Sequence, residues 1–355
     1  MDPASDCQGT LLSRVPHLNG RPAVLLFYDG FELSLRPGLT GFAYSHLRGA
    51  ARYAYRSMRR RQVWTGFYTA FRSLVVSLRR YGCDVKINRL DVAARHPDYP
   101  IGLAGYPSVL RAADLPNPRI FGPGDYGYPD AAAAVAQDPR NRILTQPSEW
   151  PVELYRGTCG DKMRVMFVGI DTDIWRDLSN QPKDLDFVVY DKIRWTDGGA
   201  RGDETPEILT QTTRLLDRRG LSYLVLRYGA HHVGQFRRAL SRARGMIFLC
   251  EHETQGLAYQ EAMASNVPVL AMDEGILVDP LQNRFAKSGF KVSTVPYFAA
   301  TCGETFVPEQ LEGSLERFMT KRPTYAPRDY VLDHLSMREA ARNYLRLYAS
   351  LASVT

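Results

Sequence analysis

Residues 249–269 read LCEHETQGLAYQEAMASNVPV, and the order of residue types predicts a strand, a loop, a helix and a second strand. The apolar residues up to Leu249 have the length of a buried strand, the helix spans 256–264, and the next strand spans 267–272. Strands that alternate with helices in this way are typical of a parallel sheet in an α/β domain. Ligands of such sheets bind at the carboxyl ends of the strands, close to helix N-termini.

Carboxylates flank the turn that leads into this helix. Glu253 lies in the loop and Glu261 in the helix, with seven residues between them, so both can face one cavity. The first N–H groups of a helix have no intrahelical partner and favour an anion such as a diphosphate. Here those donors belong to Gln255, Gly256, Leu257 and Ala258. Because a carboxylate accepts hydrogen bonds from sugar hydroxyls, the stretch predicts a site for a phosphate, a ribose and a sugar ring.

The alternation of strands and helices extends outward from this stretch in both directions. In the second half we expect strands at 187–190, 222–227 and 246–249, and helices at 205–219, 233–242, 308–321 and 336–351. In the first half we expect strands at 23–28, 84–88, 119–121, 142–145 and 163–168, and helices at 41–60 and 66–81. The stretch 178–185 is polar and has no period, so it is predicted as a linker.

The fold class that follows is α/β with two domains. We predict two Rossmann-like, doubly wound domains, residues 1–178 and 179–335, that face each other across a cleft. The helix within 336–355 is expected to pack back on the first domain.

Composition limits the class of protein. The chain has 355 residues, 45% of them hydrophobic and 23% charged, which suits two folded domains and excludes disorder throughout. No apolar run approaches the ~20 residues of a membrane-spanning helix, and residues 1–10 are too polar for a secretory signal. Five cysteines far apart in sequence favour free thiols in a reducing compartment over disulfides or a zinc site. We therefore expect a cytoplasmic protein that holds no metal.

The stretch 249–269 resembles the signature of retaining nucleotide-sugar glycosyltransferases of the GT-B fold, the glycosyl transferases group 1 type. These enzymes carry two glutamates separated by seven residues, with Gly-Leu between them and Glu-Ala-Met-Ala at the second. The matching residues here are Glu253, Gly256-Leu257 and Glu261–Ala264. Further segments that resemble the family are Gln146–Trp150, Gly169–Trp175, Tyr228-Gly229 and Arg328–Leu351. The resemblance covers residues 140–355 well, whereas the first 140 residues share only the α/β pattern.

The resemblance implies GT-B architecture and a hexosyltransferase activity. Such an enzyme would move a hexosyl group from a UDP- or GDP-linked sugar to a hydroxyl of a saccharide or lipid-linked acceptor, with retention at the anomeric carbon. The nucleotide sugar would be a co-substrate, and neither a further cofactor nor a metal would be needed. The donor would lie mostly on the second domain and the acceptor mostly on the first.

The resemblance also implies roles for residues of the second domain. Glu261 would bind the ribose hydroxyls, and Glu253 would act as a catalytic residue that holds the donor sugar near the reacting carbon. The backbone of Gln255, Gly256, Leu257 and Ala258 would contact the sugar and the diphosphate. The strand end at Tyr228 and Gly229 would frame the base.

A cation after the first strand of the second domain would stabilise the leaving diphosphate, because negative charge builds there in the transition state. Lys192 has this position and is predicted to be both catalytic and donor-binding. The family's second lysine falls near Gly198, which carries no charge. Arg194 or Arg201 would then take over its role.

In the first domain, Asp125 follows the predicted strand 119–121, where the family often has a histidine near the acceptor. We predict an acceptor-side catalytic role for Asp125, with Tyr126 and Asp29 as alternatives. Gly30, after the first strand, is predicted to belong to a phosphate-side or acceptor-side loop. Because the leaving phosphate can itself take the acceptor proton, a protein base is not required.

The net charge of +7 is concentrated in one segment. From Arg48 to Arg80 there are nine arginines, interleaved with aromatic residues, and no acidic residue. Arginine and aromatic side chains together bind single-stranded nucleic acid or anionic lipid headgroups, and a solvated helix face has the same composition. Beside a sugar-transfer motif, peripheral contact with the inner face of a membrane or with a lipid-linked acceptor is more coherent, and nucleic acid is not expected.

Single features are also compatible with other functions. Asp171 and Asp173 form an Asp-x-Asp pair that would bind a divalent metal in a metal-dependent transferase, although their place at the domain junction favours a structural role. The segment Arg48–Arg80 would serve a nucleic-acid-binding protein. His231 and His232 are adjacent, so their side chains do not face the same way and do not predict a metal pair.

Overall fold

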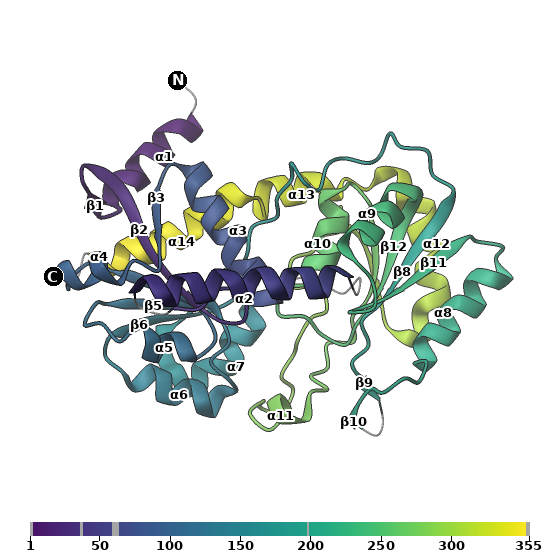
Figure 1. Ribbon diagram of the computed structural model, residues 1–355. Coiled ribbons are helices and arrows are strands. Elements are labelled where there is room, and N and C mark those ends of the chain that lie inside the picture. The colour runs from purple at the N-terminus through teal and green to yellow at the C-terminus, as the bar shows by residue number, and fades with distance from the viewer. Residues whose placement is uncertain (1–2, 36–37, 59–63, 197–198, 353–355) are drawn as a thin grey trace. The chain divides into compact units, whose positions relative to one another are not determined.

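The structure of the protein is a computed structural model that describes residues 3–35, 38–58, 64–196 and 199–352 (Figure 1). The described residues form two compact units. The first contains the chain up to Gly169 together with the residues from Ser336 onward, and the second contains Ile170–Leu335. The contacts thus divide the chain at 169/170, whereas the boundary inferred from the sequence, at 178/179, stays a prediction.

The first unit has one sheet with strand order β1-β2-β4-β5-β6-β7, and β3 also pairs with β2. All pairs are parallel except β1 with β2. The strands are β1 (His17–Leu18), β2 (Arg21–Asp29), β3 (Asp84–Ile87), β4 (Ile101–Gly105), β5 (Arg119–Gly124), β6 (Asn141–Gln146) and β7 (Met163–Val165). The helices are α1 (Pro3–Arg14), α2 (Gly38–Met58), α3 (Gly66–Tyr81), α4 (Leu90–Arg95), α5 (Ser108–Ala112), α6 (Pro129–Gln137), α7 (Glu149–Cys159) and α14 (Met337–Ala352), with a 3₁₀ turn at Gly160–Lys162.

The core of the first unit lies between its sheet and the pair of helices α3 and α14, which pack against each other. Helix α3 has the bounds that its apolar spacing predicts: Thr65 caps its start, and Gly82 follows it with a left-handed φ of 108°. From α14, the buried Tyr348 hydroxyl accepts a hydrogen bond from the Leu25 N–H at 3.0 Å and donates one to the Pro100 carbonyl. The last helix of the chain therefore completes the core around its first long strand.

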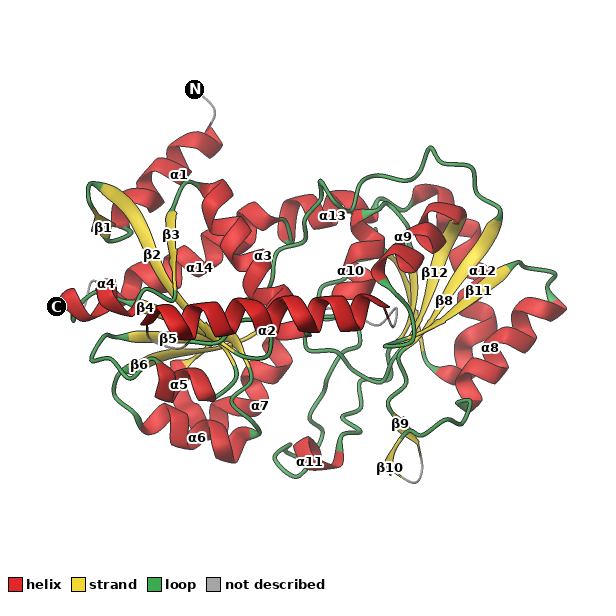
Figure 2. Cartoon of the chain, viewed as in Figure 1, coloured by secondary structure: helices red, strands yellow, loops and turns green. Residues whose placement is uncertain are grey.

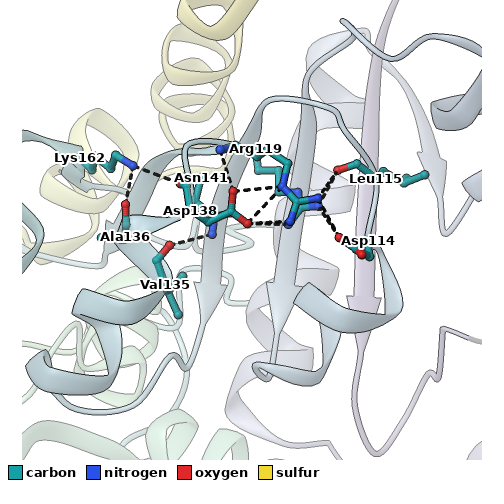
Figure 3. Close-up of polar contacts among 9 residues, drawn as sticks. Asp114, Leu115, Arg119, Val135, Ala136, Asp138, Asn141 and Lys162 are labelled. Atoms are coloured by element: carbon teal, nitrogen blue, oxygen red, sulfur yellow. Dashed lines mark hydrogen bonds and ion pairs between the residues drawn. The ribbon is translucent and has the colours of Figure 1, made fainter.

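A buried arginine fixes the amino end of β5 (Figure 3). Arg119 is 1% exposed, its Nη2 donates to the Leu115 carbonyl at 2.6 Å, and its guanidinium lies within 3.8 Å of the Asp114 and Asp138 carboxylates. A buried charge requires such partners to offset its lost hydration. Because this network is at the amino edge of the parallel strands, it supports the sheet at the end opposite to where ligands bind.

The second unit has a fully parallel sheet with strand order β11-β8-β12-β13-β14. Its strands are β8 (Leu185–Asp191), β11 (Tyr223–Arg227), β12 (Ala243–Leu249), β13 (Val269–Met272) and β14 (Gly303–Phe306), and a small antiparallel hairpin consists of β9 (Trp195–Thr196) and β10 (Gly199–Ala200). Its helices are α8 (Glu207–Arg218), α9 (Val233–Arg242), α10 (Leu257–Ala264), α11 (Pro280–Asn283), α12 (Leu311–Lys321) and α13 (Pro327–His334), with 3₁₀ turns at Pro308–Gln310 and Arg322–Thr324. Phe187, Ile247 and Leu270 from three strands pack with Leu315 and Phe318 of α12 in its core.

Both units are therefore α/β with parallel sheets, as the sequence predicts (Figure 2). The first half contains elements that the sequence pattern does not predict, above all β4 and α1. None of the described helices combines the length and the apolar character that crossing a bilayer requires.

Candidate functional site

The charged residues predicted from the sequence gather where two neighbouring strands of the second sheet end. β8 ends at Asp191, and the N–H of the next residue, Lys192, donates to the Leu249 carbonyl at 2.8 Å. β12 ends at Leu249 and continues through residues 250–256 into α10. Since β8 and β12 are adjacent and parallel, the residues that follow them lie side by side.

Lys192 and Glu253, both predicted from the family resemblance and far apart in the sequence, form an ion pair. Their side chains are 14% and 8% exposed. The Lys192 Nζ also lies 4.5 Å from the centre of the Tyr228 ring. Burial by itself lowers the pKa of Lys192, but the neighbouring groups, Glu253 first among them and then Cys250 and Tyr228, together outweigh this effect and the net pKa is raised. The lysine is therefore a fixed cation at the carboxyl edge of the sheet.

Glu251 organises the segment after β8, a role that the sequence pattern does not predict. Its Oε1 accepts hydrogen bonds from the backbone N–H groups of Arg194 and Trp195, both at 2.8 Å. The Arg194 Nη2 in turn donates to the His252 carbonyl at 2.8 Å. A single carboxylate thus ties the loop after β8 to the loop after β12. The only sequence signal was an acidic residue two positions after a buried strand.

Asp191 and Arg201 form a buried ion pair behind this loop. The Arg201 Nη1 lies 2.7 and 2.8 Å from the two carboxylate oxygens of Asp191, and these side chains are 5% and 1% exposed. The same nitrogen lies 3.2 Å from the Ile193 carbonyl oxygen. Of the two arginines proposed to replace the second lysine, Arg201 is thus engaged with Asp191, whereas Arg194 has a side chain 40% exposed. Gly198 lies outside the described residues.

The turn into α10 requires a glycine. Gly256 has a φ of 81°, and a Cβ there would lie 2.2 Å from the Tyr259 ring. The side chains of Gln255 and Gln260 bind each other, and Gln260 Nε2 donates to the Gln255 carbonyl at 2.9 Å. The first N–H groups of the helix, including those of Leu257 and Ala258, therefore have a defined direction and no intrahelical acceptor.

Glu261 lies in the second turn of α10. Desolvation by the surrounding protein raises its pKa to about 8. Among the residues that the structure describes, its carboxylate has no hydrogen-bond or ion-pair partner. Because this carboxylate is desolvated and lacks a hydrogen-bond partner, a ligand hydroxyl that donates to it would bind favourably.

Tyr228 and Gly229 follow β11, on the other side of β8. The Tyr228 N–H donates to the Asp191 carbonyl at 2.8 Å, its ring is 48% exposed, and Gly229 has a φ of 78°. The two histidines that follow have structural contacts: His231 Nδ1 lies 2.9 Å from the Arg227 carbonyl, and His232 Nδ1 accepts from the Gly234 N–H to cap α9. Within the described part of the chain, no group of three or more His, Cys, Asp or Glu side chains is placed to hold a metal ion.

A long return segment after β13 supports the site from behind. The Thr294 hydroxyl lies 3.1 Å from the carbonyl oxygens of both Cys250 and Glu251, and the Glu253 N–H donates to the Ser293 carbonyl at 3.0 Å. His252 is 2% exposed, and burial together with the Arg194 charge lowers its pKa to about 4. The sequence around 273–302 has no periodicity that predicts this contact.

The first-unit candidates lie at the carboxyl ends of β5 and β2. Asp125 is exposed, and its Oδ1 accepts from the Gly127 N–H at 2.8 Å. Gly30 is in the loop after β2, and its N–H donates to the Leu33 carbonyl at 2.9 Å. That loop also holds the buried Glu32, which accepts from the Thr65 N–H at 2.8 Å. Asp125 and Gly30 thus belong to a different unit from Lys192 and Glu253, and their roles stay predictions.

The alternative residues have local partners. Asp29 Oδ1 accepts from the Leu35 N–H at 2.8 Å, and the buried Tyr126 hydroxyl donates to the Thr145 carbonyl at 2.7 Å. Asp171 Oδ1 accepts from the backbone N–H groups of Asp173 and Ile174, at 3.1 and 3.3 Å, as in a turn. In the basic segment, Arg59, Arg60 and Arg61 lie outside the described residues.

No family model matches the sequence, and neither does any curated protein. Solved structures do resemble it. A sucrose-phosphate synthase from Thermosynechococcus elongatus superposes with a TM-score of 0.56 at 11% identity, over 94% of this chain and 100% of that one. WaaB, a lipopolysaccharide outer core galactosyltransferase, gives 0.53 at 8% identity over 94% and 100%, and AviGT4, a glycosyltransferase involved in avilamycin A biosynthesis, gives 0.50 at 14% over 94% and 99%. At such identities the likeness is one of fold, and the predicted α/β fold class of GT-B type is confirmed.

Proposed function

We propose that the protein is a retaining, metal-independent glycosyltransferase that moves a hexosyl group from a UDP- or GDP-linked sugar to a hydroxyl of a saccharide or lipid-linked acceptor. One observation carries this proposal. A largely buried cation, Lys192, and a carboxylate, Glu253, meet beside the N-terminus of α10 at the carboxyl edge of a parallel sheet. This combination supplies a counter-charge for a diphosphate, an acceptor for sugar hydroxyls and backbone donors for phosphate oxygens.

The chemistry needs stabilisation of a leaving group. The bond between the anomeric carbon and the phosphate oxygen breaks while a bond from the acceptor oxygen to that carbon forms. Negative charge grows on the departing diphosphate, and Lys192, Arg194 and the N–H groups of Leu257 and Ala258 stabilise it. The acceptor proton passes to a leaving phosphate oxygen on the same face of the sugar. Retention at the anomeric carbon follows from attack on the face that the leaving group vacates.

The remaining residues orient the substrates. Glu261 accepts hydrogen bonds from the ribose hydroxyls, Glu253 holds hydroxyls of the donor sugar, and Tyr228 and Gly229 border the base. Asp125 and the loop at Gly30 contact the acceptor on the first unit. The enzyme requires no cofactor besides its nucleotide-sugar co-substrate. Its buried free thiols, Cys83, Cys159, Cys250 and Cys302, suit the reducing cytoplasm in which we place it.

The test is nucleotide binding followed by product analysis. We expect one nucleoside diphosphate to raise the melting temperature of the full chain equally with and without EDTA, since a ligand that binds only the folded state stabilises it. Lys192→Ala should reduce this shift, whereas Lys321→Ala, which removes an exposed lysine paired with Glu304, should keep it in full. NMR of the transfer product should show the anomeric configuration of the donor. An inverted product contradicts retention, and loss of activity in EDTA that manganese restores contradicts metal independence.

A further inference from the structure

Helix α2 turns an apolar face outward. Of the fifteen exposed large hydrophobic side chains in the described residues, five are on this helix: Tyr44, Leu47, Tyr53, Tyr55 and Met58. Met58 and Leu47 have the highest exposure of them all, 77% and 72%. Eleven residues are about three helical turns, so Leu47 lies on the same face as Met58, and Tyr44 on the same face as Tyr55. The small exposed residue Ala51 lies between these two rows, and the exposed Ala43 and Ala54 lie beside Leu47.

Contacts on the opposite side fix this orientation. A Cβ at Gly49 would lie 2.9 Å from the Glu32 carbonyl oxygen, so the helix backbone approaches the loop after β2 closely. The Arg52 guanidinium lies 3.9 Å from the buried Glu32 carboxylate and 5.2 Å from the centre of the Phe31 ring. A surface helix ordinarily buries its apolar stripe and exposes its charges. In α2 the arginine at position 52 faces the unit, and the apolar side faces away from it.

The charge of this region identifies the kind of partner. Arg48 is exposed at the border of the apolar face, and neither α2 nor α3 contains an acidic residue. A second copy of the chain would bring two positively charged helices together, which costs free energy. A nucleic acid would satisfy the arginines but would leave Leu47 and Met58 in water. An anionic bilayer satisfies both, because it offers acyl chains to the apolar face and phosphates to the arginines.

We propose that the outward face of α2 is a docking surface for an anionic lipid bilayer. Leu47, Tyr55 and Met58 enter the boundary between headgroups and acyl chains, and Arg48 binds lipid phosphates. The helix lies parallel to the membrane plane, with Arg52 and Gly49 still against the first unit. Membrane binding needs neither the sugar donor nor the acceptor substrate, so its test is independent of the test of the proposed transfer reaction.

The experiment is flotation of the full chain with vesicles of phosphatidylcholine alone and with about one third phosphatidylglycerol. We expect about tenfold stronger partitioning onto the anionic vesicles, and at least partial release at high salt, because exposed charges are screened. Leu47→Asp with Met58→Asp should lower partitioning about tenfold or more. Leu332→Asp is the matched control, because Leu332 is an exposed leucine of α13, 42% exposed, outside the docking surface. Arg48→Gln should lower only the preference for anionic vesicles.

Two outcomes would overturn the proposal. In the first, the unaltered chain fails to float with anionic vesicles. In the second, the double variant floats as well as the Leu332 control. A dimer that the double variant converts to a monomer, without vesicle binding, would assign the face to a second copy. Salt-dependent capture of an oligonucleotide without vesicle binding would assign the arginines to nucleic acid. Since all the substituted side chains are exposed, the melting temperature of each variant should stay that of the parent, and the milder pair Leu47→Ala with Met58→Ala provides a second test.

Discussion

Lys192 keeps a positive charge in a largely buried position because the Glu253 carboxylate lies beside it. Each residue of this pair depends on the other, because removal of one would leave a buried charge without a partner. Under the proposed function, a diphosphate would meet a cation already in place, so the charge that stabilises the leaving group would need little reorganisation.

We therefore expect Lys192→Ala to lower kcat by about 10²–10³, the usual effect of removing one group that stabilises developing charge. Lys192→Arg should retain part of this activity because it keeps the charge. Steady-state kinetics with the accepted nucleotide sugar measure both variants, with Lys321→Ala as the control. A Lys192→Ala enzyme with unchanged kcat would show that the leaving group is stabilised elsewhere.

The raised pKa of Glu261, about 8, makes donor binding dependent on pH. If ribose hydroxyls donate to its carboxylate, binding favours the ionised form, so below pH 8 a proton must be released. Nucleotide affinity should then fall by up to about tenfold per pH unit as the pH decreases from 8 toward 6.5. Calorimetry across this range checks the slope, and Glu261→Gln should remove it. An equal slope in Glu261→Gln would assign the titration to another group.

The raised pKa of Glu261 also affects the free energy of unfolding, but in the opposite direction: a lower pH weakens nucleotide binding and favours the folded chain. Because the folded-state pKa of Glu261 is raised, the folded chain binds more protons than the unfolded chain between about 4.5 and 8. Its contribution to the free energy of unfolding is therefore present at low pH and is lost as the pH rises through this window. Glu261→Gln should accordingly melt at a higher temperature than the parent at pH 8.5.

At the scale of the element, the segment between β8 and α8 returns Arg201 to Asp191, where the two form a buried pair under the loop 192–195. Arg201→Ala leaves Asp191 buried without its partner, and we expect a loss of about 3–5 kcal/mol in the free energy of unfolding. Arg219→Ala removes an exposed arginine paired with Glu312 and should leave the free energy of unfolding almost unchanged, because exposed ion pairs contribute little. Urea denaturation followed by circular dichroism compares the two. Equal small losses would mean that water reaches Asp191.

Elements with strong local signals could be predicted from the sequence, and elements held by distant contacts could not. Helix α3 has apolar residues at helical spacing and a glycine after its end, so its bounds follow from local rules. Strand β4, Ile101–Gly105, contains two glycines within a region rich in proline and glycine, and its pairing with β2 decides its conformation. The site shows the same contrast. The seven-residue spacing together with the flanking Gly-Leu and Glu-Ala-Met-Ala singled out Glu253 and Glu261, whereas Glu251 acquires its role from amides more than fifty residues earlier.

At the scale of the whole molecule, the chain leaves the first unit after Gly169 and returns to it at Ser336. Its last helix, α14, then contributes Tyr344 and Tyr348 to a core whose strands belong to the first half of the chain. Local sequence pattern predicts that 336–351 is helical and amphipathic, but the identity of the surface that it covers depends on contacts across more than 300 residues.

We expect Tyr348→Ala to lower the free energy of unfolding of the first unit by about 3–5 kcal/mol, because it opens a cavity and removes two buried hydrogen bonds. Tyr55→Ala, an exposed tyrosine of α2, should change it by less than about 0.5 kcal/mol. Thermal unfolding monitored with a nucleoside diphosphate present separates the units, since nucleotide protection of the second unit should persist in Tyr348→Ala. Loss of that protection would mean that the two units unfold as one.

The reactivity of the Cys250 thiol can report how often the loop of the site, residues 250–256, opens. Its thiol is fully buried, burial raises its pKa well above the ordinary value, and its Sγ lies 3.5 Å from both the His252 carbonyl and the Glu253 carboxylate. An alkylating reagent can therefore reach this sulfur only while residues 250–256 are transiently open. The rate of alkylation therefore measures how often this loop opens. A bound substrate that covers Glu253 should lower that rate.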